Sequence, residues 1–312
     1  MADWTINDIP AQAGRLAVVT GTGGLGYETA LALAGAGAEV VMAGRSETKG
    51  QEAIRRVRAQ HPGAAVSFAA LDLASLDSVA AFADRFTAAH RRLDLLINNA
   101  GVMALPERQE TADGFEMQLG TNYLGHFALT GHLLPLLLRG QQPRVISLSS
   151  GLHRQGQIDF ADLQAVRRYR AWPVYGQSKL AMLLFAAELQ RRSDAHGWGL
   201  LSASAHPGWA RTELVANGPG ASGISARVMG LLAPVFGQSG AAGALPTLMA
   251  STAPGIKGGA YYGPLGLGNL RGAPGLNTPA PQGQNAAVAA RLWDVSEVLT
   301  GVKFAAPVAV AS

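Results

Sequence analysis

The chain has 312 residues, of which 48% are hydrophobic, 15% are charged and 39 are glycine. This composition is typical of a folded soluble enzyme and excludes a disordered or fibrous protein. The net charge of +4 is small and scattered, which argues against a nucleic-acid partner. Because the chain contains no cysteine, disulfides and thiolate metal sites are excluded as well.

No stretch of the sequence has the pattern of an export signal or a membrane span. The N-terminus carries Asp3 and Asp8 and lacks a basic start followed by an apolar run. The longest apolar stretch, Leu124 to Leu138, is interrupted by polar residues and a proline, and it falls short of the ~18 residues that cross a bilayer. We therefore expect a cytoplasmic protein.

A glycine turn follows the first predicted strand. The run from Arg15 to Gly21 is apolar and rich in β-branched residues, and it leads into Gly21-Thr-Gly23-Gly-Leu25-Gly26 and a helical stretch from Tyr27 to Ala36. Glycines allow the backbone to approach a pyrophosphate, whose charge the amides at the helix N-terminus can bind. This order predicts a dinucleotide site, with a plain glycine turn as the alternative.

The alternation of strands and helices continues along the chain. Further strands are predicted at Glu39 to Ala43, Val66 to Leu71, Leu93 to Ile97, Arg144 to Leu148 and Gly199 to Ala205, with a last strand at Tyr261 and Tyr262. Helices are predicted at Glu47 to Gln60, Leu76 to His90, Gly120 to Leu138 and Ala286 to Leu299, with one more containing Tyr175. Repeated β-α units predict an α/β fold, a doubly wound Rossmann-type parallel sheet with helices on both faces.

No domain boundary is visible, so we expect a single Rossmann-type domain over residues 1–312. Its cofactor half would cover about residues 15–150, its catalytic and substrate half about 151–302, and its C-terminal tail 303–312. Ligands of such sheets bind at the carboxyl ends of the strands. Asp72, Asn98 and Ser150 all follow predicted strand ends.

Tyr175 and Lys179 are the central chemical pair of the sequence. Residues four apart lie on one helix face, so the ammonium of Lys179 can stand beside the phenol of Tyr175. A free tyrosine has a pKa near ~10, and a neighbouring positive charge brings that pKa toward the working range of a general base. An aromatic ring packed under a lysine stem is the alternative.

Together these features resemble the short-chain dehydrogenase/reductase family, and within it the retinol dehydrogenase-like branch. The resemblance runs from about Arg15 to about Val302. The residues that carry it are the glycine turn, Asp72-Leu73, Asn98-Asn-Ala-Gly101, Asp113-Gly-Phe-Glu, Asn122-Tyr-Leu-Gly-His-Phe127, Ser149-Ser150, Tyr175 to Lys179, and Pro207-Gly208 with Thr212.

The resemblance implies a catalytic group of Asn122, Ser150, Tyr175 and Lys179. Tyr175 would be the general acid/base and Ser150 would hydrogen-bond the substrate oxygen. Lys179 would lower the tyrosine pKa and bind the nicotinamide ribose, while Asn122 would hold the water that links this lysine to solvent. The alternative for Asn122 is a solvent-facing helix residue.

The same resemblance implies that Asp72 meets the adenine, Asn99 the adenosine side and Thr212 the nicotinamide amide, and a helix cap is the alternative for Asp72. We expect cofactor contacts from Gly21, Gly23, Leu25, Gly26, Arg45, Asp72, Leu73, Asn99, Ala100, Gly101, Tyr175, Lys179, Pro207, Gly208 and Thr212.

Two departures from the family pattern stand out. The family's phosphate turn is normally Gly-x-x-x-Gly-x-Gly, whereas Gly21 to Gly26 is one residue shorter and matches the common dinucleotide fingerprint. The distance from Ser150 to Tyr175 is long for the family and like that of the retinol dehydrogenase-like branch. We expect the insert, roughly Ile158 to Trp172, to cover part of the substrate pocket.

The residues after the second predicted strand favour NADP(H) over NAD(H). NAD sites usually carry a carboxylate there, and this chain has Ala43-Gly44-Arg45, whose arginine can pair with a 2′-phosphate. In the alternative, Arg45 only stacks on the adenine and Glu47 turns toward the ribose. We expect Glu47 in the first turn of the next helix, where its charge is favourable.

The sequence thus predicts an NADP(H)-dependent enzyme that interconverts a small apolar alcohol with its ketone or aldehyde by hydride transfer. An NAD-dependent alcohol dehydrogenase, a non-catalytic dinucleotide-binding sensor, and an epimerase or dehydratase are the alternatives. The family implies a homodimer or homotetramer, which pairs through the helices of Asn122 and Tyr175. We expect no metal site, because His126 and His132 have no evident partner ligands, and apolar pocket walls from Trp172, Trp209, Met229 and Phe236.

Overall fold

The computed structural model describes residues 3–210 and 238–304. Their centre is one eight-stranded sheet of order β3-β2-β1-β4-β5-β6-β7-β8, in which β8 alone runs antiparallel to its neighbour. The strands are β1 (Leu16–Thr20), β2 (Glu39–Gly44), β3 (Val66–Ala70), β4 (Leu95–Asn98), β5 (Arg144–Leu148), β6 (Leu201–Ala205), β7 (Tyr261–Gly266) and β8 (Arg271–Asn277).

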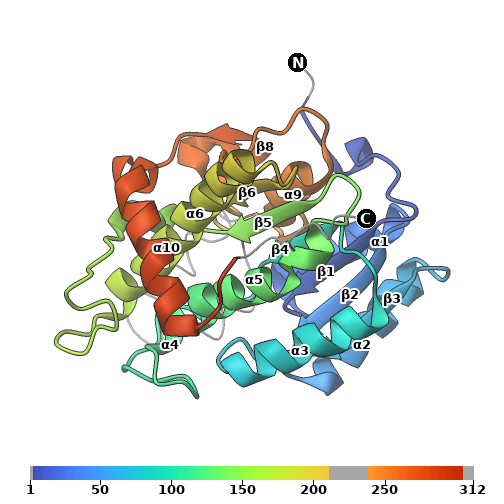
Figure 1. Ribbon diagram of the computed structural model, residues 1–312. Coiled ribbons are helices and arrows are strands. Elements are labelled where there is room, and N and C mark those ends of the chain that lie inside the picture. The colour runs from blue at the N-terminus through green and yellow to red at the C-terminus, as the bar shows by residue number, and fades with distance from the viewer. Residues whose placement is uncertain (1–2, 211–237, 305–312) are drawn as a thin grey trace.

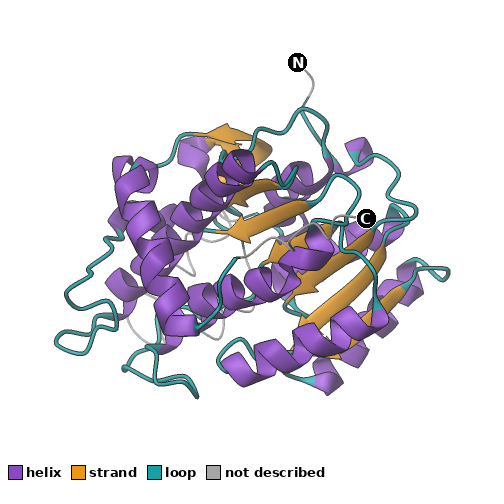
Figure 2. Cartoon of the chain, viewed as in Figure 1, coloured by secondary structure: helices purple, strands orange, loops and turns teal. Residues whose placement is uncertain are grey.

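Helices cover both faces of this sheet (Figures 1 and 2). They are α1 (Gly24–Gly35), α2 (Glu47–Gln60), α3 (Leu76–Ala89), α4 (Met117–Leu119), α5 (Gly125–Leu137), α6 (Ala171–His196), α9 (Gly240–Thr252) and α10 (Ala286–Thr300). Two separate apolar cores result, one including residues of α1, α2 and α9 and the other residues of α3, α5, α6 and α10. Strands buried on both faces explain why β1, β4 and β5 read as nearly continuous apolar runs. The predicted doubly wound α/β class is confirmed.

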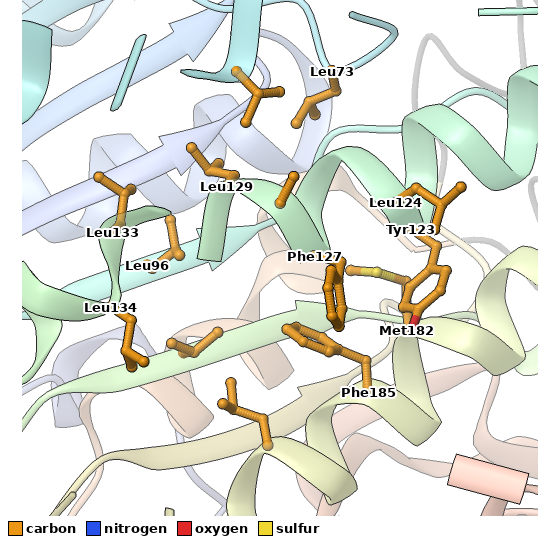
Figure 3. Close-up of a cluster of buried hydrophobic side chains, with 14 of the residues drawn as sticks. Leu73, Leu96, Tyr123, Leu124, Phe127, Leu129, Leu133, Leu134, Met182 and Phe185 are labelled. Carbon is orange, nitrogen blue, oxygen red and sulfur yellow. The ribbon is translucent and has the colours of Figure 1, made fainter. Parts of the chain in front are cut away.

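An aromatic cluster fixes the C-terminal helix to α5 and α6. Phe127 and Phe185 stand side by side in Figure 3. Their ring centroids are 5.7 Å apart, and Trp293 of α10 lies 5.1 Å from Phe127. Phe304, which we expected in a tail, lies 4.3 Å from Trp293 and 4.9 Å from Phe127. The C-terminal helix α10 thus packs against α6 and, through this aromatic cluster, against α5.

Three elements differ from the predicted ones. The predicted helix from Gly120 to Leu138 is divided, since a π-helical turn at Gly120–Leu124 separates α4 from α5. A π-helical turn adds one residue to a single turn of a helix. The helix is apolar both before and after this turn, so the hydrophobic pattern of the sequence does not reveal it. Helix α9 and strand β8 were not predicted, and β8 in particular is rich in glycine and proline, which disfavour strands.

Candidate active site

The predicted site residues meet at one edge of the sheet, where the parallel strands end. The glycine turn follows β1, Asn99 follows β4, and Ser150 follows β5. These loops enclose a cavity of about 490 Å³. Its lining includes Leu25, Asn99, Gly101, Met103, Leu148, Ser150, Leu152, Arg154, Trp172, Tyr175, Lys179, Pro207, Gly208, Trp209, Tyr261 and Leu270.

Tyr175 and Ser150 form the hydrogen-bonded pair of this cavity. Tyr175 lies in the first turns of α6 and is 5% exposed, and its phenol is hydrogen-bonded to the side chain of Ser150. Burial raises the pKa of Tyr175 to about 12, and this hydrogen bond opposes the rise. The expected lowering of that pKa by Lys179 is not found, because Lys179 does not contribute to the shift and burial outweighs the Ser150 hydrogen bond. Tyr175 is therefore a neutral phenol at pH 7.

Lys179 stands one helical turn beyond Tyr175, as the spacing predicted. Its Nζ lies 5.7 Å from the centroid of the Tyr175 ring and donates to the Leu148 carbonyl oxygen at 3.2 Å. Burial lowers the pKa of Lys179 to about 8, because no carboxylate compensates for its desolvation. This ammonium can lose its proton within the physiological pH range.

Asn122 occupies the π-helical turn and is fully buried, so the solvent-facing alternative is wrong. Its side chain bridges two segments. Oδ1 accepts from the Val102 amide at 2.7 Å, while Nδ2 donates to the Val102 carbonyl at 2.9 Å and to Ser178 Oγ at 2.9 Å. Both amide hydrogens are thus used by the protein, so a water could be held only through the remaining oxygen lone pairs.

His126 belongs to the site, although its sequence position did not reveal this. It is fully buried one turn after Asn122, with Nδ1 2.8 Å from the Asn122 carbonyl oxygen and Nε2 2.9 Å from Thr20 Oγ1. Thr20 is the last residue of β1 and also accepts from the amides of Asn99 and Ala100. In the sequence, the four-residue spacing between Asn122 and His126 was the only sign that His126 contacts the Asn122 backbone.

The glycine turn has the shape that a pyrophosphate requires. A Cβ on Gly26 would stand 2.4 Å from the Gly21 carbonyl oxygen, so only glycine fits there. Gly21 has a φ of +92°, a conformation that favours glycine. Helix α1 begins after Gly23 with no side chain capping it, so its first amides are open to an anion. The residues present therefore fit a dinucleotide, even with the shortened turn.

The residues around the expected adenosine end lie at the ends of β2 and β3. Arg45 is exposed and directly follows β2, whereas Glu47 begins α2, as predicted. Asp72 is half-buried and its Oδ1 accepts from the Ala74 amide at 3.0 Å. The cap of α3 is Ser75, so the capping alternative for Asp72 is wrong.

Other expected residues are placed as follows. Leu73 is buried in the core cluster below the cofactor edge, so it does not line the cavity itself. Pro207 and Gly208 follow β6 on the cavity wall. Thr212, Met229 and Phe236 lie outside the described residues.

Of the predicted insert, roughly Ile158 to Trp172, only Trp172 lines the cavity, and it stands in the first turn of α6. Trp172 lines the cavity at 38% exposure and stands edge-on to Tyr175, with 6.4 Å between the ring centroids. Two hydrogen bonds attach the insert to the segment that contains Leu105 and Glu116. Gln164 Oε1 accepts from the Glu116 amide at 2.7 Å, and the Tyr169 hydroxyl donates to the Leu105 carbonyl at 2.8 Å. Arg154 and Lys179 are the charged residues on an otherwise largely apolar wall.

Within residues 3–210 and 238–304, no group of three or more histidine, aspartate or glutamate side chains could hold a metal ion. Both ring nitrogens of His126 are occupied by protein atoms, and His132 is exposed on α5. No helix in the described part of the chain is both long and apolar enough to cross a membrane.

Comparison with known proteins agrees with this geometry. The family model for short chain dehydrogenases matches residues 15–219. Polyprenol dehydrogenase of Mus musculus is 45% identical over 255 residues, covering 80% of this chain and 75% of that protein. Retinol dehydrogenase 12 of Homo sapiens is 38% identical over 294 residues, covering 93% of this chain and 88% of that protein.

A crystal structure of an uncharacterized protein from Mycobacterium paratuberculosis is 38% identical to this chain. It superposes with a TM-score of 0.81 and covers 97% of this chain and 100% of that one. The fold, the strand-end site and these relatives agree, and the resemblance seen in the sequence is confirmed. The chain belongs to the short-chain dehydrogenase family, in its retinol dehydrogenase-like branch, and is an oxidoreductase enzyme.

Proposed function

We propose that this enzyme interconverts an apolar alcohol with its aldehyde or ketone, using NADP(H). The observation that carries the proposal is the convergence of Ser150, Tyr175 and Lys179 on a largely apolar cavity next to the glycine turn. Such a cavity can hold a substrate oxygen at its polar end and an apolar chain along its walls. When bound, the nicotinamide supplies or accepts the hydride.

The chain's own residues would handle the proton and the oxygen. Ser150 Oγ, already hydrogen-bonded to the phenol, would orient the substrate oxygen against Tyr175. Because the Tyr175 pKa is raised to about 12, the phenol holds its proton at pH 7 and can donate it to a carbonyl oxygen that gains negative charge. The buried Lys179 ammonium beside it would hold the ribose hydroxyls and stabilise the phenolate that remains. A protonated Tyr175 phenol and a charged Lys179 ammonium favour carbonyl reduction at neutral pH.

The substrate class follows from the cavity wall and from the relatives. Leu152, Trp172 and Leu270 are among the apolar side chains around the opening. The relatives are named for retinol and polyprenol, both extended isoprenoid alcohols. We propose an extended apolar alcohol or aldehyde of that kind.

A substrate panel tests this function. Purified protein is mixed with NADPH or NADH and with aldehydes of increasing apolar length, including retinal and a polyprenal, and cofactor oxidation is followed at 340 nm. We expect turnover with NADPH and a kcat/KM that rises with chain length. Binding of cofactor without any turnover would support a sensor, and cofactor retained through purification would support an epimerase or dehydratase.

Cofactor binding should weaken at alkaline pH. Since burial lowers the Lys179 pKa to about 8, the ammonium is present below that pH and is lost as pH rises through it. We expect the Kd for NADPH to be constant from pH 6 to 7.5 and then to rise up to about tenfold per pH unit. Fluorescence titration from pH 6 to 9.5 measures this. Lys179→Met should bind weakly at every pH, and an equally steep rise in that variant would assign the titration elsewhere.

Trp172 should affect substrate affinity more than turnover. Its indole covers the cavity beside Tyr175, so Trp172→Ala removes apolar contact from the substrate chain. We expect KM for a long-chain aldehyde to rise about tenfold, with kcat within about threefold. Val166→Ala is the matched control, because Val166 is 70% exposed on the same insert and does not line the cavity. Equal effects of the two variants would place the substrate elsewhere.

A further inference from the structure

A continuous chain of hydrogen bonds joins the cofactor edge of the sheet to Asn122. Nδ1 of His126 lies 2.8 Å from the Asn122 carbonyl oxygen. A carbonyl can only accept, so Nδ1 carries the proton and Nε2 is an acceptor. The Thr20 hydroxyl can therefore donate to Nε2 at 2.9 Å, which is nearer than its other acceptor, the Ile97 carbonyl oxygen at 3.2 Å.

Thr20 completes the chain on the other side. With its proton given to His126, its oxygen accepts the Asn99 amide at 2.8 Å and the Ala100 amide at 3.0 Å. Its carbonyl also accepts from Asn99 Nδ2 at 2.7 Å. The next residue is Gly21, so the end of β1, the loop after β4 and the π-helical turn are held by one imidazole.

His126 is suited to this only as a neutral ring. Burial, together with the nearby Lys179 ammonium, lowers the pKa of His126 to about 3, although the hydrogen bond to the Asn122 carbonyl opposes this shift. The groups that it contacts, Thr20 and Asn122, carry no charge. A second proton would turn Nε2 into a donor, and the Thr20 hydroxyl would then have only the Ile97 carbonyl oxygen, at 3.2 Å, as an acceptor. The bonding pattern is thus constant across the working pH range.

The Asn122 side chain packs closely against the Gly101 backbone. A Cβ on Gly101 would stand 2.7 Å from Asn122 Oδ1 and 3.4 Å from Lys179 Nζ. Asn122 and Lys179 therefore both stand against the Gly101 backbone. Like other turns of this kind, the π-helical turn of Asn122 stands next to a functional site.

We infer that His126 is a positioning residue that holds the Asn99–Ala100 loop and the Asn122–Lys179 group in register for cofactor binding. This inference rests on the proposed function and deepens it. The bound cofactor would contact both segments at once, so the link between the segments affects the affinity for the cofactor. His126 itself does not line the cavity.

The test compares His126→Leu, which loses both hydrogen bonds, with His126→Asn, whose amide can still donate from about the position of Nδ1. We expect the Kd for NADPH to rise at least about tenfold in His126→Leu and to return to within about threefold of the parent value in His126→Asn. Thr20→Val should weaken binding in the same way. Adding His126→Leu to Thr20→Val should cost little more, because Thr20→Val already removes the link to His126.

Tyr123→Phe is the control for a purely structural effect. It lies in the same π-helical turn and loses a buried hydrogen bond to Ser296 Oγ, at 2.8 Å, on the side away from His126. We expect a lower Tm in Tyr123→Phe with unchanged NADPH affinity. The inference is overturned if His126→Leu, like Tyr123→Phe, lowers Tm but keeps NADPH affinity within about threefold of the parent value.

A second readout does not depend on cofactor or turnover. In protein labelled with ¹⁵N-histidine, His126 should show a protonated Nδ1 and an unprotonated Nε2 from pH 5 to 9. The opposite tautomer, or titration within that range, would overturn the link. Failure of the proposed function would appear differently, as normal NADPH affinity and the expected tautomer with no turnover of any carbonyl.

Discussion

Turnover in Tyr175→Phe should fall by about 100-fold or more, while the Kd for the cofactor stays within about threefold of the parent value. The Tyr175 phenol is hydrogen-bonded to the Ser150 side chain and can give a proton to the substrate oxygen, whereas the other cavity phenol near Ser150, that of Tyr261, donates to the Ser150 backbone carbonyl. Phenylalanine keeps the ring and its packing against Trp172 but removes that proton. A 100-fold loss corresponds to about 2.7 kcal/mol of transition-state stabilisation.

Lys179→Met separates the role of the phenol from the role of the ammonium. Because the ammonium serves both cofactor and phenol, we expect it to lower turnover and to weaken cofactor binding together, unlike Tyr175→Phe. Stopped-flow measurement of a single turnover separates the chemical step from product release in both variants. Near-normal turnover in Tyr175→Phe would falsify the assignment of the proton donor.

The second large effect concerns cofactor choice. Arg45→Ala should weaken NADPH binding about 10- to 100-fold and NADH binding less than about threefold. Its exposed guanidinium follows β2 and has no ion pair with any described carboxylate, so it is available to a 2′-phosphate. Arg55→Ala is the control, since Arg55 is an exposed arginine of the following helix that pairs with Glu52.

Gly44→Asp should reverse the preference toward NADH, because its carboxylate would repel a 2′-phosphate and accept from ribose hydroxyls. Gly44 has no positive φ, and a Cβ there would stand 3.1 Å from Thr22 Cγ2, so the Thr22 methyl must yield by a few tenths of an ångström. Both variants are measured as kcat/KM with each cofactor. A higher kcat/KM with NADH in the parent protein would overturn the NADP(H) proposal.

The fold and most of the site residues could be predicted because they depend on local patterns. Strands such as β1 and β5 are short apolar runs, and the glycine turn has a backbone shape that only glycine allows. The Tyr175–Lys179 spacing places two groups on one turn wherever the helix lies. These features hold in any tertiary context, so the sequence by itself determined the sheet, its ligand edge and the central pair.

Other properties were decided only by tertiary packing. The Tyr175 pKa is raised and not lowered, because the burial of the phenol depends on segments far apart in the chain. In the sequence, His126 has the pattern of an ordinary helix residue. Its role depends on the fold, which places Thr20 of β1 2.9 Å from its ring. Trp293 of α10 and Phe304, which follows it, pack against Phe127 of α5, contacts that join residues more than 100 positions apart. Desolvation and long-range hydrogen bonds are properties of the assembled core, and no local pattern carries them.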